Sequence, residues 1–201
     1  MSIIRHQRLF IIITCAALLV FIVRTMNIRR SRKTTLTDEQ HQLTPIPIDQ
    51  PVRAELEYFP KNTHLPPIKE GLASGWIDLN TFSPEKNLIR IDDPRVWWES
   101  DHDKNDTEDD HVIHKSLEAP IRRLIELVCQ HDGTLEIHDA YRPIGIHNPK
   151  SLHKEGRAVD VTCDDFPLEK LAKLCWSAGF DWVFYEASSK KGAHIHCSVK
   201  R

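Results

Sequence analysis

The feature that most constrains this 201-residue chain is a set of possible metal ligands near its C-terminus. Residues 151–160 read SLHKEGRAVD, and a His-Ile-His triplet follows at 194–196. His153, Asp160 and His196 form a donor set that suits zinc, and three protein ligands leave a fourth position open for water. An open position is typical of a catalytic zinc, so the set indicates hydrolytic chemistry.

The two parts of this set differ in how specific they are. The chain contains 12 histidines, so a chance His-x-His pair is expected and the triplet alone is weak support for a metal. The pattern Leu-His-x-x-Gly-x-Ala-x-Asp is sharper, because Gly156 and Ala158 are small where a metal would crowd the chain. Asp160 lies in an apolar stretch, where a carboxylate needs a partner that zinc would supply.

Glu186 and His194 are two further acid/base candidates beside the predicted ligands. Alternation along a strand over 194–199 places His194 and His196 on the same face. If that strand forms a hairpin with 181–186, Glu186 can converge with both histidines. Either Glu186 or His194 would then take the proton of a zinc-bound water as general base, and the sequence leaves the choice between them open.

The hydrophobic periodicity predicts an α+β domain with a central, mostly antiparallel sheet flanked by helices. Alternating patterns predict four strands, at 134–139, 158–162, 181–186 and 194–199. Apolar residues at helical spacing predict two helices, at 120–130 and 168–178. These elements do not alternate regularly as strand and helix, which argues against a parallel sheet of the α/β class.

An unbroken uncharged run at residues 9–23 dominates the N-terminus. It is shorter than the roughly 20 apolar residues of a spanning helix, but snorkelling of Arg8 and Arg24 would lengthen it. We expect an uncleaved signal-anchor, with a cleaved signal peptide as the alternative. The basic downstream flank opposes the orientation that we expect on functional grounds, with the domain outside the cytoplasm.

The chain is long enough for one domain and an anchor. We expect a tail and transmembrane anchor at 1–28, a polar, proline-containing linker at 29–57 and the zinc domain at 58–201. The formal net charge of -2 gives no basic field, so no nucleic-acid partner is expected. The acidic stretch at 99–110 is expected to be an exposed loop, and calcium binding by its carboxylates is the alternative.

Five cysteines occur, and none forms a Cys-x-x-Cys pair, so a zinc site made of cysteines alone is not expected. Cys129 and Cys175 fall in apolar helical patterns and are expected to be buried free thiols. Disulfides among Cys129, Cys163, Cys175 and Cys197 remain open, because connectivity cannot be read from sequence.

Three C-terminal segments resemble the hedgehog N-terminal signalling domain. They read SLHKEGRAVDVT at 151–162, AGFDWVFYE at 178–186 and AHIHCSVK at 193–200. The resemblance covers roughly residues 58–200, and that domain is similar in turn to the zinc D-Ala-D-Ala metallopeptidases (the M15, lysostaphin-like group). It implies their shared zinc-binding fold, with a metal and an acid/base pair at residues already named: His153, Asp160, His196, Glu186 and His194.

The chain also departs from the hedgehog pattern. The carboxylates of the hedgehog calcium site look mostly lost: Asp110 and Asp139 remain, while Arg142 stands where a further acid is expected. The stretch Asp-Ala-Tyr-Arg-Pro at 139–143 resembles the Asp-x-Tyr-Arg-Pro segment of the peptidases. That resemblance implies that Arg142 holds a substrate carboxylate or an oxyanion. A surface arginine before a proline turn is the alternative.

Together these features favour a membrane-anchored zinc metallopeptidase that cleaves peptide bonds. Peptidoglycan stem peptides or cross-links are the expected substrate, and the periplasmic face of a bacterial inner membrane is the expected location. Whether the chain is an active enzyme stays open, and the alternative is a non-catalytic, zinc-stabilised hedgehog-like binding or signalling module. A third possibility is an inert zinc closed by a fourth protein ligand, for which His147 is the candidate.

Overall fold

The structure is a computed structural model, and it describes residues 53, 56–99, 110–143, 148–189 and 192–201. All of these belong to one compact unit, Asp49–Arg201. The predicted anchor at 1–28, most of the predicted linker and acidic loop, and His147 lie outside the described residues. Among the described residues, none forms a helix long and apolar enough to cross a membrane.

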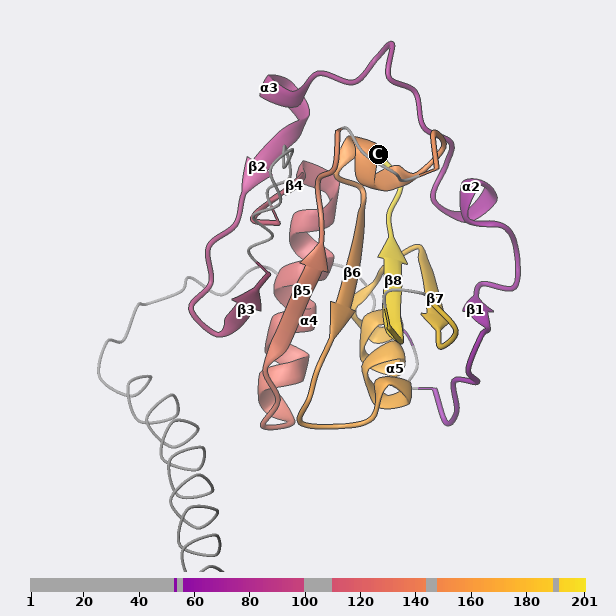
Figure 1. The fold of residues 1–201 in the computed structure, drawn as a ribbon, viewed down its shortest axis with the longest axis vertical. Helices are drawn as coiled ribbons and strands as arrows, with labels where there is room; N and C mark the ends of the chain where they lie inside the picture. Colours follow the sequence, from indigo (N-terminus) through magenta and orange to yellow (C-terminus); the bar gives the residue numbers. More distant parts are fainter. Residues whose placement is uncertain (1–52, 54–55, 100–109, 144–147, 190–191) are drawn as a thin grey trace, which may run out of the picture. The chain divides into compact units, whose positions relative to one another are not determined.

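A mixed six-stranded sheet forms the centre of this unit, in the order β1-β7-β8-β6-β5-β3 (Figure 1). Four neighbouring pairs are antiparallel, and the β3–β5 pair is parallel. The α+β class predicted from the sequence is confirmed, with one parallel pair that the sequence did not predict. The strands are β1 His64–Leu65, β3 Val96–Trp98, β5 Leu135–Asp139, β6 Ala158–Thr162, β7 Trp182–Glu186 and β8 His194–Ser198.

Two helices, α4 (Glu118–Gln130) and α5 (Leu168–Ala178), lie together behind the sheet in Figure 1. Each helix buries one apolar face, which in α4 consists of Ile121, Leu124, Ile125 and Val128. This spacing is that of an amphipathic helix, and burial of the stripe is its main source of stability. Gly179 ends α5 with a φ of 100°, a left-handed conformation that glycine adopts without strain. Both helices agree closely with the prediction.

Alternation along β6 and β8 separates the core from the site. Val159, Val161, Ile195 and Cys197 are fully buried in the hydrophobic core. Because neighbouring side chains on a strand point to opposite faces, the residues between them point away from that core. These intervening residues include Asp160 and His196, which are paired partners in the β6–β8 register.

The remaining elements are short. They are α2 Glu70–Ala73, α3 Pro84–Asn87, β2 Leu88–Arg90, β4 Val112–His114, η1 Lys115–Leu117 and η2 Leu152–Glu155. The 3-10 turn η2 ends at Gly156, which has a φ of 66° and accepts a 2.8 Å hydrogen bond from the backbone N–H of His114. A Cβ at Gly156 would stand 2.9 Å from that nitrogen, so this glycine is required for the turn.

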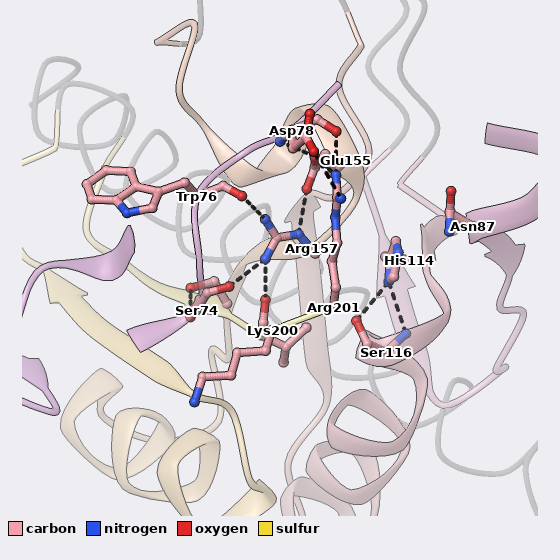
Figure 2. A network of polar contacts seen from close by, with 12 residues as sticks. Ser74, Trp76, Asp78, Asn87, His114, Ser116, Glu155, Arg157, Lys200 and Arg201 are labelled. Carbon is pink, nitrogen blue, oxygen red and sulfur yellow. Dashed lines mark hydrogen bonds and ion pairs between the residues drawn. The ribbon is translucent and has the colours of Figure 1, made fainter. Parts of the chain in front are cut away.

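A fully buried arginine fastens the N-terminal part of this unit to the sheet (Figure 2). Arg157 donates to the carboxylate of Glu155 at 2.6 Å and to the Val199 carbonyl at 3.0 Å. It also donates to the carbonyls of Ser74 at 2.5 Å and Trp76 at 3.0 Å. We call these five residues the Arg157 network.

The four domain cysteines are all free thiols. Cys163, Cys175 and Cys197 are buried, and Cys129 is half-buried. The prediction of a buried free thiol is therefore confirmed for Cys175, whereas Cys129 keeps part of its surface exposed. Burial raises the pKa of the Cys129 thiol above its ordinary value, which makes it a poorer nucleophile.

Candidate metal centre

The structure brings the three predicted ligands together in one cluster, His153, Asp160 and His196. His153 Nε2 lies 3.4 Å from His196 Nδ1 and 3.5 Å from Asp160 Oδ1. His196 Nδ1 lies 2.7 Å from Asp160 Oδ1. Donors about 2.0–2.1 Å from a tetrahedral zinc stand roughly 3.3 Å apart, so the two longer separations already fit zinc. We call these three residues the His/Asp cluster.

Local structure fixes each of these side chains. The β6–β8 pairing places Asp160 opposite His196, and the η2 turn carries His153 to them. His153 Nδ1 lies 2.9 Å from the Ala140 carbonyl oxygen, which can only accept a hydrogen bond. Nδ1 therefore carries the ring hydrogen, and the Nε2 lone pair faces the cluster, which is the tautomer that a metal requires.

Burial and charge act against each other in the cluster. Burial, the largest single effect, favours the neutral form of Asp160, yet His153 and His196 hold the pKa of this carboxylate well below its ordinary value. Burial also opposes charge on His196, but Asp160 and Glu70 raise the pKa of this imidazole well above its ordinary value. A metal ion at His196 Nδ1 would therefore have to displace a proton.

The predicted acid/base pair also converges on this site. Glu186 and His194 are partners in the β7–β8 register. His194 Nε2 lies 3.4 Å from Glu186 Oε2 and 3.7 Å from Asp160 Oδ2, and its Nδ1 donates to the Gly192 carbonyl at 3.0 Å. His194 thus lies beside the ligand Asp160, Glu186 contacts His194, and their acid/base role stays a prediction.

Arg142 lies in a different setting from the exposed one considered as an alternative. Its side chain is only 4% exposed, and its guanidinium contacts the carboxylate of Asp139. It also donates to the His138 carbonyl at 3.1 Å and lies 4.0 Å from Asp110 Oδ1. A buried guanidinium thus neutralises the two carboxylates that the sequence analysis connected with calcium.

A pocket of about 590 Å³ opens beside the cluster. Five of its twelve lining residues are acidic, and Arg142 and His194 lie in the same lining. His138 lies in its wall between the carboxylate of Glu99, at 2.8 Å, and the hydroxyl of Thr162, at 2.6 Å.

One residue of the site was missed by the sequence analysis. Glu70 begins α2, and its Oε1 lies 2.8 Å from His196 Nε2. Burial works against its charge, but the hydrogen bond with His196 lowers the pKa of Glu70 below its ordinary value. Neither a motif nor a strand pattern marks this glutamate, because its role depends on the packing of a four-residue helix against β8.

Comparison with known proteins places this geometry in a family. Residues 32–198 match the Hedgehog amino-terminal signalling domain. The chain belongs to this family. The sequence motifs around His153, Asp160 and His196 show the same resemblance.

Individual hedgehog proteins are similar to about half of the chain. The Indian hedgehog protein of Gallus gallus is 40% identical over 103 residues, which are 49% of this chain and 24% of that protein. The Tiggy-winkle hedgehog protein of Danio rerio is 39% identical over 49% of this chain and 24% of its own length. Protein hedgehog of Drosophila hydei is 34% identical over 49% of this chain and 21% of its own length. The chain thus spans about a quarter of the length of the curated relatives it matches.

The hedgehog family corrects several expectations. A hedgehog signalling domain is not a peptidoglycan metallopeptidase, so the predicted peptidoglycan substrate and cell-wall role are wrong. The predicted single-pass location at a bacterial inner membrane is wrong for the same reason. The error has a physical origin: a zinc donor set fixes the metal and its geometry, whereas a substrate is selected by the surrounding surface.

Proposed function

We propose that this domain is a non-catalytic, zinc-stabilised module that acts by binding a protein partner, as a hedgehog signalling domain does. The observation that carries the proposal is the buried convergence of His153, Asp160 and His196 in a chain of this family. Two imidazole nitrogens and one carboxylate oxygen suit zinc better than calcium or magnesium. Bound zinc would link η2, β6 and β8 and would thereby stabilise the folded state.

A protein partner is supported by apolar side chains that gather in one segment beside the cluster. Exposed large hydrophobic residues in the 68–79 segment are Ile68, Leu72, Trp76 and Leu79. The Trp76 ring lies against Gly71 of α2, where a Cβ would meet it at 2.5 Å. Exposed aromatic and large apolar side chains are enriched at protein contact surfaces, which supports this segment as a place for a partner to bind.

The catalytic roles of Glu186, His194 and Arg142 stay predictions, as does the wider similarity to the zinc D-Ala-D-Ala peptidases. The zinc domain at 58–201 is likewise our proposed boundary. The surroundings of Arg142 favour the binding module: although Arg142 lies in the pocket lining, its guanidinium is already paired with Asp139, so less of its charge is available for a substrate oxyanion.

Binding and hydrolysis can be separated with the full chain. We expect the zinc-loaded protein to bind a receptor ectodomain that also binds the Indian hedgehog protein. Chelation or His153→Ala should weaken this binding, and Glu136→Gln is the control because Glu136 lies in the pocket wall outside the cluster. The zinc-loaded chain should leave a mixed peptide library uncut. Zinc-dependent cleavage, or the absence of binding, would contradict the proposal.

A further inference from the structure

Two carboxylates contact the His196 ring, one at each ring nitrogen. Nδ1 lies 2.7 Å from Asp160 Oδ1, inside the His/Asp cluster. Nε2 lies 2.8 Å from Glu70 Oε1, outside the cluster, and 126 residues separate this pair in the sequence. Glu70 therefore contacts the nitrogen that does not face the other two ligands.

The chemistry of imidazole gives this contact a specific consequence. A metal binds a ring nitrogen through its lone pair, so a metal on Nδ1 of His196 requires the hydrogen to be on Nε2. Glu70 is the acceptor for that hydrogen, because an ionised carboxylate only accepts hydrogen bonds. The contact thus selects the tautomer and holds the ring plane toward His153 and Asp160.

Glu70 does not depend on His196 alone for its position. The indole N–H of Trp182 donates to the Ile68 carbonyl at 2.8 Å, just before α2. The hydroxyl of Ser74, just after α2, lies 2.8 Å from that of Ser198 on β8. The carbonyl of Ser74 also accepts from Arg157 (Figure 2). Contacts on both sides therefore place the carboxylate before any metal is bound, so little ordering entropy opposes its contribution.

We propose that Glu70 is the outer carboxylate of the metal centre, a positioning residue that accepts the hydrogen bond of metal-bound His196 and couples metal binding to the docking of α2. This inference rests on the proposed zinc site. A cation on Nδ1 withdraws electron density from the ring and strengthens Nε2–H as a donor. Metal binding therefore stabilises the docked position of α2. By linkage, the docking of α2 raises the affinity for the metal by the same factor.

Zinc affinity of the full chain, measured by competition with a chromogenic chelator, tests the first part. Glu70→Ala should bind zinc about 10–100-fold more weakly than the wild type, as is typical when an outer partner of a ligand is removed. Glu70→Gln should lie between them, because the amide oxygen still accepts the hydrogen bond but carries no charge. Glu85→Ala is the matched control, since Glu85 also lies in the first turn of a four-residue helix but contacts Ser83 instead.

Two further measurements distinguish positioning from direct coordination. The visible absorption bands of the cobalt-substituted protein should keep their position in Glu70→Ala, because the ligands of the metal are unchanged. Amide hydrogen exchange at 70–74 should slow when zinc is added to the wild type. That zinc-dependent protection should be lost in Glu70→Ala and retained in Glu85→Ala.

Each outcome decides a separate point. A wild-type chain that binds no zinc overturns the proposed zinc site itself. A wild type that binds zinc, with equal affinity and equal protection in Glu70→Ala and Glu70→Gln, leaves the site intact and overturns the role of Glu70. Cobalt bands that shift in Glu70→Ala would make Glu70 a direct ligand, which also overturns the positioning role. Near-wild-type circular dichroism of Glu70→Gln keeps the test valid if Glu70→Ala misfolds.

Discussion

The Arg157 network and the His/Asp cluster both hold the N-terminal part of the domain against the sheet, but they differ in the positive charge that does so. Both fasten the N-terminal part of the domain to the sheet, the first through the Ser74 and Trp76 carbonyls and the second through Glu70. In the first region the positive charge belongs to the chain, because the buried Glu155 faces Arg157 at 2.6 Å. In the second region Asp160 and Glu70 raise the pKa of His196 and so favour a proton on its ring, which the proposed metal ion would replace.

This difference in the source of the positive charge distinguishes a purely structural contact from one that can also bind a metal. An arginine side chain keeps its charge at every physiological pH, and its five donors can be satisfied completely by a fixed set of acceptors. A histidine, unlike an arginine, can give up its proton and then offer a lone pair to a metal. Arg142 resembles Arg157 in this respect, because its guanidinium lies between the carboxylates of Asp139 and Asp110.

The largest expected effect tests the built-in cation. Arg157→Met should lower the free energy of unfolding by about 3–5 kcal/mol, because it removes a principal partner of the buried Glu155 carboxylate. Urea denaturation measures this change. Arg90→Met is the control: its partner Asp92 is exposed, and a surface pair contributes less than about 1 kcal/mol. Equal effects of the two substitutions would remove the distinction between this network and an ordinary surface pair.

The exchangeable cation predicts a different response. Zinc at about 100 times its dissociation constant should raise the free energy of unfolding of the wild type by about 2.7 kcal/mol. Asp160→Asn should abolish this gain, because it removes one of three ligands, while Arg157→Met should retain most of it. Thermal denaturation with zinc and with chelator measures both. A zinc-induced gain that survives in Asp160→Asn would show that the metal binds elsewhere.

His114 lies beside the Arg157 network and predicts a smaller, pH-dependent effect. Burial first, and then the charge of Arg157, hold the pKa of His114 below its ordinary value. The folded state therefore favours the neutral ring: stability should be level above the ordinary histidine pKa of about 6.5 and should fall as pH drops below it. One such group changes the free energy of unfolding by at most about 1.4 kcal/mol per pH unit.

Urea denaturation of the wild type and of His114→Asn between pH 5 and 8, with chelator present, isolates this slope as the difference between the two curves. His114→Asn should remove the contribution of His114 to the pH dependence of the free energy of unfolding. At the start of η1 the His114 ring accepts a hydrogen bond from the Ser116 N–H, and the asparagine side-chain oxygen can replace it as the acceptor. An unchanged slope in this variant would assign the pH dependence to another group.

The smallest expected effect concerns calcium. Millimolar calcium should change the melting temperature little, because the Arg142 guanidinium stands against Asp139 and Asp110 and would repel the ion. Differential scanning fluorimetry with calcium and with magnesium measures this. A large upward shift with calcium that disappears in Asp110→Asn would show that these carboxylates bind the ion despite the arginine.

The sequence predicted those parts of the site that depend on local pattern. His153 and Asp160 lie seven positions apart in one motif, and strand alternation places His194 and His196 together, so their convergence needed only the β6–β8 pairing and the adjacent η2 turn. Glu70 could not be predicted, because its contact with His196 depends on how a short helix packs against a distant strand. The parallel pairing of β3 with β5 was also missed, because a strand of three residues is too short to show an alternating apolar pattern.

The lengths of the outer strands limit how a partner can bind. The described sheet ends at β1 with two residues and at β3 with three, so neither edge offers a long row of unpaired backbone N–H and C=O groups. Such short edges protect a sheet from edge-to-edge aggregation. They also leave little room for a partner to add a strand of its own, which is a common mode of peptide recognition. Within the described residues, a proposed partner would therefore meet side chains rather than a long unpaired strand edge.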